Sequence, residues 1–361
     1  MRRTSMGRQS FTGRGALSNP PGRFDRQKLE AVDDGWFLEE SPDSIATTLE
    51  PDRARSVITT NDSPDIPFEK SINPYRGCSN GCVYCFARPS HGYLGLSPGI
   101  DFETRLFYKA DAAKLLEAEL ARPDYVCKPI TVGANTDPYQ PVERQMKVTR
   151  SILEVLARAR HPVTVITKSA MVLRDLDLLA EMARNGLATV GVSVTSLDNE
   201  LKRTLEPRAA SPQARLRALA ALSAAGVPSG VLVAPVIPAL TDHEMERILE
   251  EAARAGVRWA GYVLLRLPYE IKDLFTEWLA EHYPERAAHV MSLISAMRGG
   301  RANDPRFGFR MRGTGPYAEL LRNRFRIACR RLNLNAAARD PLNTALFRPP
   351  APPGSQLRLE L

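Results

Sequence analysis

The sequence has no run of 18 apolar residues, so it contains no segment that could cross a membrane as a helix. Its first residues include paired arginines, but no apolar segment follows them, which is unlike an export signal. Cysteine is scarce, with five in 361 residues. An odd and low number of cysteines excludes a scaffold stapled by disulfides. We therefore expect a cytoplasmic protein in which clustered thiols bind a metal.

A glycine-rich dinucleotide-binding fingerprint is also missing, because GYLGLSPG at 92–99 does not stand between a strand and a helix. The middle of the chain instead alternates between strand-like and helix-like segments. The strand-like segments are 71–77, 129–136, 163–169, 188–196, 229–240 and 258–268, and the helix-like ones are 142–160, 173–186, 211–226 and 241–256. The strands are apolar on both faces, as in a buried parallel sheet. This alternation predicts an α/β fold, and a βα barrel is favoured over a doubly wound sheet.

In a βα barrel the chemistry takes place at the carboxyl ends of the strands. Several polar side chains follow the predicted strands, and we expect them to share one mouth with the loop after the first strand. They are Asn135, Thr136, Asp137, Lys168, Ser169, Ser193, Thr195, Ser196 and Arg266.

That first loop reads GCSNGCVYCFARPSHG and carries three cysteines with the spacing C-x3-C-x2-C: Cys78, Cys82 and Cys85. Three kinds of site fit such a loop. A structural zinc ion would need a fourth ligand, for which His91 is the candidate. A cluster that only carries electrons would need a fourth cysteine, Cys127 or Cys329. A 4Fe–4S cluster with one iron left open would instead bind a small molecule there.

The cysteine spacing, with the aromatic Tyr84 before the last cysteine, resembles the signature of the radical S-adenosylmethionine (SAM) superfamily. The resemblance implies a partial (β/α)6 TIM-like barrel over about residues 68–270, with a 4Fe–4S cluster and SAM as cofactors. In that superfamily the reduced cluster breaks the S–C5′ bond of SAM, and the resulting 5′-deoxyadenosyl radical takes a hydrogen atom from the substrate. It also implies a low-potential electron donor of the flavodoxin or ferredoxin kind.

Three runs resemble more closely the spore photoproduct lyase-like group, which is associated with DNA repair: SINPYRGCSNGCVYCFARPSH, NTDPYQPVE and VTVITKSA. On that match the cofactor-binding residues are Tyr84 near the adenine, Lys168 on the methionine carboxylate and Ser193 on the ribose, together with Thr136 and Asp137. The Gly-Gly-Glu run that holds the methionine amine in many radical SAM enzymes is replaced here by ANTDP.

A second departure concerns the reaction. Spore photoproduct lyases carry a cysteine just before their Thr-Ser-Asp, and it returns a hydrogen atom to the repaired thymine. Ala134 and Asn135 stand at those positions here. The resemblance therefore implies radical SAM chemistry, but not thymine-dimer repair by that mechanism.

Charge is uneven along the chain, which has a net charge of +8. Residues 298–331 carry ten arginines against two acidic side chains, and Arg322, Arg326 and Arg330 form a stripe on a predicted helix over 317–334. Such a stripe could follow the phosphates of DNA or RNA, or could be the solvated face of a packed terminal helix. A peptide or a small metabolite is the alternative substrate, and a non-enzymatic iron–sulfur or zinc-binding module is the alternative to an enzyme.

The chain divides by composition into five predicted parts. They are a basic, disordered arm (1–45), a lead-in segment (46–67), the radical SAM core (68–270), a C-terminal helical extension (271–346) and a Pro-rich tail (347–361).

Overall fold

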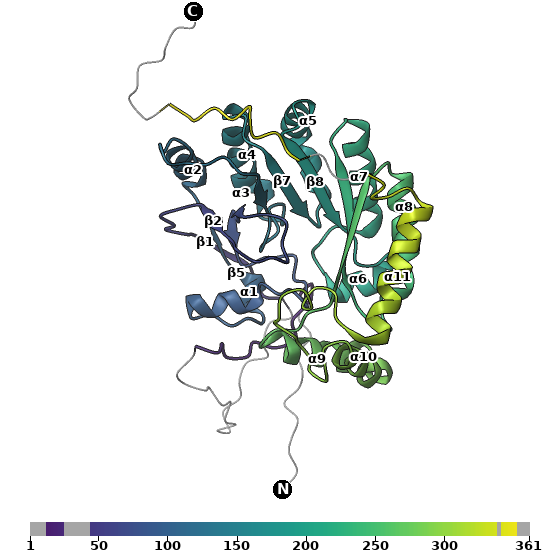
Figure 1. Cartoon of the computed structure of the whole chain (residues 1–361). Helices are drawn as coiled ribbons and strands as arrows, with labels where there is room; N and C mark the ends of the chain where they lie inside the picture. The colour runs from purple at the N-terminus through teal and green to yellow at the C-terminus, as the bar shows by residue number, and fades with distance from the viewer. Residues whose placement is uncertain (1–11, 25–43, 338–340, 352–361) are drawn as a thin grey trace, which may run out of the picture.

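The computed structural model describes residues 12–24, 44–337 and 341–351. Its main sheet has seven strands in the order β10-β9-β8-β7-β6-β3-β2. Their bounds are β2 Ile58–Thr60, β3 Lys70–Ile72, β6 Ile130–Val132, β7 Val163–Thr167, β8 Ala188–Ser193, β9 Ser229–Val236 and β10 Trp259–Leu264. β2 is antiparallel to β3, whereas from β3 to β10 each strand is parallel to its neighbour. Six parallel strands in chain order, with β2 and β10 at the edges, form the predicted open barrel (Figure 1).

Helices between the parallel strands cover the outer face of the sheet (Figure 1). They are α4 Val148–Arg158, α5 Leu176–Arg184, α7 Pro212–Ala224 and α8 Met245–Arg254. Alternate valines of β7 and β8, such as Val163 and Val190, are fully buried in one apolar core with these helices. Ser211 begins α7 as predicted, because its hydroxyl accepts the Ala214 N–H at 3.2 Å.

The opposite, inner face of the strands carries small residues where the strands approach one another. At Gly230 an added Cβ would lie 2.0 Å from Cδ2 of Trp259, which is the paired residue of β10. Only glycine leaves room for the indole ring at this point, so Trp259 fills the interior of the barrel near the start of its last strand.

One predicted helix, over 142–160, is two helices in the structure: α3 Glu143–Met146 and α4. The break lies at Lys147, whose φ of 53° is left-handed. The Glu143 carboxylate explains the new start, because it accepts the N–H of Thr149 at 3.0 Å, in the first turn of α4. The helices predicted over 173–186 and 241–256 likewise begin with short 3₁₀ turns, η2 Ala170–Asp175 and η3 Asp242–Glu244.

A smaller sheet is formed by one strand before and two strands after the first parallel strand. It has the order β1-β5-β4, formed by β1 Thr48–Pro51, β5 Arg105–Tyr108 and β4 Tyr75–Arg76. The 3₁₀ helix η1 Arg88–Leu94 and the short α1 Asp101–Thr104 precede β5, and α2 Ala112–Leu120 leads back to the barrel. This excursion lies next to the cysteine loop.

The C-terminal extension is helical, with α9 Ile271–His282, α10 Pro284–Ala296 and α11 Gly315–Arg331. α9 and α10 bury Phe275, Trp278 and Val290 in a second apolar cluster that also contains Cys82 and Tyr84. α11 lies beside α8 (Figure 1), where Arg324 pairs with Glu246 at 2.7 Å. No helix among the described residues is both long and apolar enough to span a membrane.

Within the predicted arm over 1–45, residues 12–24, which we call the strap, contact the rest of the chain. Ala16 in the strap is fully buried, and the Glu103 carboxylate accepts the N–H groups of Gly15 and Ala16. A segment rich in glycine and proline is ordered here because a buried carboxylate binds its main chain. Residues 1–11 and 25–43 of the predicted arm lie outside the described residues.

Candidate active site

The three predicted cysteines lie on the loop that follows β3 and β4, at the carboxyl end of the parallel strands. All three are free thiols; Cys78 and Cys82 are buried and Cys85 is partly exposed. The loop turns at Gly77 and Gly81, whose φ values of 74° and 71° suit glycine. The Cys78 N–H donates to the carbonyl of Phe102 at 2.9 Å. The loop therefore has a defined course although it contains little regular secondary structure.

The run NTDPYQ, which follows β6, supports this loop. Gln140 is fully buried; its side-chain oxygen accepts the Ser79 N–H at 2.8 Å, and its side-chain nitrogen donates to the Gly77 carbonyl at 3.2 Å. The Thr136 hydroxyl donates to the Tyr75 carbonyl at 2.9 Å. Both side chains thus bind the main chain on either side of Cys78.

Asp137 joins the cysteine loop to the next strand. Its carboxylate accepts hydrogen bonds from the Asn80 side chain (3.0 Å), the Thr167 hydroxyl (2.6 Å), the Lys168 N–H (2.7 Å) and the Tyr139 N–H (2.9 Å). A carboxylate has about four lone-pair positions, so these four hydrogen bonds occupy all of them. Asp137 therefore fixes the end of β7 relative to the cysteines.

A buried ion pair holds the other side of the loop. Arg88 and Glu103 are both fully buried and in contact. Arg88 also donates to the carbonyls of Cys82 (2.9 Å) and Gly81 (3.3 Å), and its remaining N–H groups bind the carbonyls of Pro98 and Gly99. All five guanidinium N–H donors are therefore used. This pairing satisfies charges that would be costly to bury alone.

Tyr84, between the second and third cysteines, belongs to another buried network. Its hydroxyl donates to the carboxylate of Glu206, which also accepts from the Thr195 hydroxyl at 2.7 Å. Arg215 pairs with Glu206 and donates to the Ser193 carbonyl at 3.0 Å. The network thus joins the cysteine loop to the end of β8. Burial raises the pKa of Glu206, but the opposing charges of Arg215 and Lys168 and its hydrogen bonds lower it to about 2.

Lys168, at the end of β7, directs its ammonium toward the same loop. The nitrogen lies 5.9 Å from the centroid of the Tyr84 ring. Burial raises the pKa of Cys82 well above its usual value, and the Lys168 charge opposes that effect. The structure therefore brings Lys168, Tyr84 and the cysteines together at the barrel mouth, as the sequence predicts.

Comparison with known proteins assigns this arrangement to a family. The sequence model of the radical SAM superfamily matches residues 72–252, just over half of the chain. The chain belongs to this superfamily. A protein of Mycobacterium tuberculosis without an assigned function is 39% identical over 230 residues, covering 63% of this chain and 68% of its own. The radical SAM Nalpha-GlyT isomerase of Pseudomonas phage M6 is 23% identical over 269 residues, covering 67% of this chain and 50% of its own.

Solved structures show the same fold for the radical SAM domain. A spore photoproduct lyase variant with bound AdoMet and dinucleoside spore photoproduct matches with a TM-score of 0.57 and 17% identity, covering 79% of this chain and 78% of its own. At that identity the match shows a shared fold. The open barrel described above is therefore the radical SAM barrel.

Membership in the radical SAM superfamily implies SAM and an iron–sulfur cluster, and the cysteine loop fits a cluster. Each thiolate of a cluster binds its own iron, whereas a single zinc ion needs its ligands around one point. Within the described part of the chain, no three His, Cys, Asp or Glu side chains converge in that way. The candidate fourth zinc ligand, His91, has its Nε2 2.9 Å from the Arg105 carbonyl oxygen. Burial raises the pKa of Cys78 to about 12, so binding of iron would release its proton.

The other two cysteines lie apart from the loop. Cys127 precedes β6, so it stands at the amino end of the strands, opposite the loop. Cys329 is buried on the outer helix α11, where its sulfur contacts the Asn335 side chain at 3.8 Å. Neither is placed to act as a fourth ligand beside Cys78, Cys82 and Cys85.

Some of the predicted SAM-binding side chains face the cysteines, whereas others already form hydrogen bonds within the chain. Lys168 and Tyr84 face the cysteines, and Ser193 ends β8 beside Arg215. The hydroxyl of Thr136 and the carboxylate of Asp137 are bound within the chain. Contacts of these residues with SAM stay predictions.

Five side chains around the loop were not found by sequence reasoning: Arg88, Glu103, Gln140, Glu206 and Arg215. Gln140 lies inside the run NTDPYQPVE, whose resemblance to relatives was a usable signal. Arg88 lies inside the run SINPYRGCSNGCVYCFARPSH, whereas Glu103, Glu206 and Arg215 lie outside any quoted run. All four are charged, and charged residues are usually exposed. Their burial arises from pairs that form only in the folded chain.

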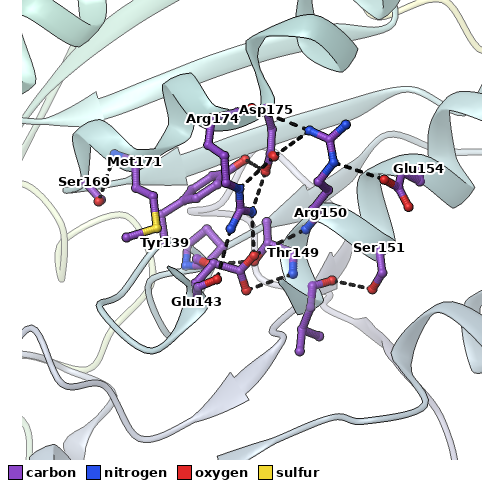
Figure 2. A network of polar contacts seen from close by, with 12 residues as sticks. Tyr139, Glu143, Thr149, Arg150, Ser151, Glu154, Ser169, Met171, Arg174 and Asp175 are labelled. Atoms are coloured by element: carbon purple, nitrogen blue, oxygen red, sulfur yellow. Dashed lines mark hydrogen bonds and ion pairs between the residues drawn. The ribbon is translucent and has the colours of Figure 1, made fainter. Parts of the chain in front are cut away.

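A third polar network joins side chains of the segments that follow β6 and β7, and Figure 2 shows its contacts. Arg174 pairs with the buried carboxylates of Glu143 (2.6 Å) and Asp175 (2.8 Å). The Tyr139 hydroxyl donates to the Asp175 carboxylate at 2.9 Å, and Arg150 forms an ion pair with the same carboxylate at 3.0 Å. This network fixes the start of α4 and of α5, so its role is structural.

The predicted arginine stripe lies on α11, away from the loop. Arg322, Arg326 and Arg330 are exposed, while Arg324 and Arg331 pair with glutamates of α8. The helix therefore divides its arginines between a packed side and a solvent-facing side.

Proposed function

We propose that the chain holds a 4Fe–4S cluster on Cys78, Cys82 and Cys85 and cleaves SAM reductively, so that a hydrogen atom is abstracted from a substrate. The observation that carries this proposal is the group of three free thiols at the barrel mouth, two of them buried and one partly exposed, faced by Lys168, with neither remaining cysteine in reach. When bound and reduced, the cluster supplies the electron that breaks the S–C5′ bond.

Three side chains have defined tasks in this proposal. Lys168 binds the methionine carboxylate as a point charge. Glu206 accepts a hydrogen bond from the Tyr84 hydroxyl and so fixes the ring of Tyr84, which can then lie beside the adenine. Arg215 keeps Glu206 ionised and in place. The buried surroundings keep water away from a reactive radical.

For the substrate we propose nucleic acid, DNA or RNA, and its modification rather than repair with hydrogen return from a cysteine, since Ala134 and Asn135 replace that cysteine. The spore photoproduct lyase of similar fold supports this class, since its structure holds a dinucleoside spore photoproduct. The exposed stripe of Arg322, Arg326 and Arg330 would contribute phosphate contacts. A cytoplasmic location and a low-potential flavodoxin-like or ferredoxin-like electron donor belong to the same proposal.

The mouth itself offers a surface of arginines and aromatic rings. Phe86, directly after Cys85, is 50% exposed, and Arg266 at the end of β10 lies 5.9 Å from its centroid. Arg310 and Arg306 lie 4.6 Å and 5.0 Å from the exposed rings of Phe307 and Phe309. Aromatic rings flanked by arginine can stack unpaired bases and bind the adjoining backbone.

The deciding experiment is a substrate-dependent transfer of deuterium into 5′-deoxyadenosine. The reduced, cluster-loaded protein is given SAM and a panel of deuterated DNA, RNA and peptides. Transfer from a nucleic acid supports the proposal. Transfer only from peptides or from a small metabolite would replace the proposed substrate class while leaving the radical SAM reaction intact.

A further inference from the structure

The strap, residues 12–24, touches the cysteine loop with its main chain. A Cβ added at Gly15 would lie 1.8 Å from the carbonyl oxygen of Gly81, which stands between Cys78 and Cys82. The backbone of Gly15 is not left-handed, so the cysteine loop, and not the local conformation, requires glycine there. The next residue, Ala16, is fully buried in the apolar cluster that contains Cys82 and Tyr84.

The strap is also bound to the carboxylate that supports the loop. The two oxygens of Glu103 accept the N–H groups of Gly15 (3.0 Å) and Ala16 (2.9 Å), and the Arg14 guanidinium donates to the Glu103 carbonyl at 3.1 Å. Glu103 pairs with Arg88 on its other side, and Arg88 binds the Cys82 carbonyl. A continuous set of buried contacts therefore runs from the strap to a cysteine ligand.

The middle of the strap is fixed as well. The Ser18 carbonyl accepts the Ile100 N–H at 3.3 Å, and a Cβ at Gly99 would lie 2.1 Å from that carbonyl oxygen. The Ser18 hydroxyl donates to Glu277 of α9 at 2.6 Å. The strap thus crosses from the cysteine loop to the C-terminal extension and covers the segment between them.

We propose that the strap is part of the cluster site. Docked, it holds the cysteine loop in its cluster-binding conformation and shields that side of the loop from solvent. Released, it leaves the loop free to open and the cluster exposed to chelators and oxygen. The proposal relies on the iron–sulfur cluster that the family implies, whereas the docking of the strap does not.

Two substitutions in the full-length chain would release the strap from opposite sides. Gly15→Ala introduces a Cβ where the Gly81 carbonyl lies. Glu103→Gln keeps the shape of the side chain but replaces one of the two accepting oxygens with a donor. Pro21→Ala is the matched control, because Pro21 is an exposed strap residue. We expect an iron chelator to remove iron from both variants, loaded anaerobically, about tenfold faster than from the wild type, and from the control at the wild-type rate.

Trypsin cleavage after Arg14 gives a readout that does not need the cluster. Arg14 is 5% exposed in the docked strap, so cleavage should be slow in the wild type and in Pro21→Ala and faster in Glu103→Gln. Faster cleavage with an unchanged rate of iron loss would overturn the proposal. If Gly15→Ala does not fold, Ser18→Ala, which removes the hydrogen bond of the strap to Glu277 and leaves the Arg88–Glu103 pair intact, decides together with Glu103→Gln. A wild type that binds no iron would overturn the proposed function as well, whereas a loaded wild type with unaffected variants would overturn only the role of the strap.

Discussion

Two buried networks that pair carboxylates with arginines flank the barrel mouth, and they support different parts of the chain. In one, Tyr84 donates to Glu206, which pairs with Arg215. In the other, Tyr75 donates to Glu143, which pairs with Arg174. The side chains of Glu206 and Arg215 are 3% and 1% exposed, whereas Arg174 is 24% exposed and shares a second carboxylate. The first network ends on the cysteine loop and the second on the start of a helix, so matched substitutions can separate cofactor binding from stability.

The largest expected effect is on the network of Tyr84, Glu206 and Arg215, in which the paired carboxylate and guanidinium are almost fully buried. Arg215→Ala leaves the buried Glu206 without its opposing charge, and we expect a loss of about 3–5 kcal/mol in the free energy of unfolding. Arg174→Ala should cost less, because Arg174 is itself 24% exposed and Asp175 keeps its contact with Arg150. Urea unfolding of the cluster-free proteins measures both changes. Equal losses would show that the two networks do not differ in the way proposed.

The pH dependence of stability tests Glu206 directly. Its pKa of about 2 in the folded protein lies below the value of about 4.3 expected when unfolded. The stability that its ionisation contributes is therefore present above pH ~4.3 and lost as the pH falls toward 2, an effect on the order of 2–3 kcal/mol. Glu206→Gln should flatten that part of the curve of unfolding free energy against pH. A curve with the wild-type slope would contradict the assignment.

The two tyrosines provide the sharpest matched pair. Tyr84→Phe and Tyr75→Phe each remove one hydroxyl from a buried carboxylate, so each should cost about 1–3 kcal/mol of stability. Only Tyr84→Phe should also weaken the binding of SAM to the cluster-loaded protein, because only Tyr84 belongs to the cysteine loop. Equilibrium dialysis with labelled SAM measures the difference. Equal weakening in both variants would mean that the effect is transmitted by general loosening of the fold.

A smaller effect, mainly on cofactor binding, is expected at Lys168. Lys168→Met removes the charge at the barrel mouth but keeps the aliphatic chain. SAM should bind about tenfold more weakly, or about 1.4 kcal/mol, while the urea midpoint falls less than in Arg215→Ala, because Arg215 still opposes the charge of Glu206. Unchanged SAM affinity would place the methionine carboxylate elsewhere.

The smallest effect is expected on the surface of α11. Replacing Arg322, Arg326 and Arg330 together by glutamine should weaken binding to single-stranded DNA and RNA and lower the slope of log affinity against log salt. The matched control replaces Arg324 and Arg331, which pair with α8. A larger change of slope in the control than in the stripe variant would reject the stripe as the phosphate-binding face.

The barrel could be predicted from the sequence because its strands are marked by local patterns. The run VTVITKS is β-like and VLVAPVI is apolar on both faces, and each is followed by a helix of amphipathic period. The cysteine loop was equally visible, since all three ligands lie within eight positions. Local spacing encodes both features.

The supports of the loop could not be predicted in the same way. Glu103 and Glu206 are 18 and 121 residues beyond Cys85, and their burial depends on meeting Arg88 and Arg215 in the folded chain. The contacts of the strap could not be predicted for a related reason. The composition of the strap is that of a flexible segment. Its position is instead fixed by contacts with Glu103 and Gly81, which cannot be predicted from the residues of the strap alone.

The most direct test of the central claim combines iron content with SAM cleavage in three proteins. The wild type, Cys82→Ala and the double variant Cys127→Ala/Cys329→Ala are reconstituted anaerobically, reduced and given SAM. We predict about four irons per chain and formation of 5′-deoxyadenosine in the wild type and the double variant, and neither in Cys82→Ala. Loss of the cluster in the double variant, or zinc without iron in the purified wild type, would contradict a cluster with an open iron on this loop.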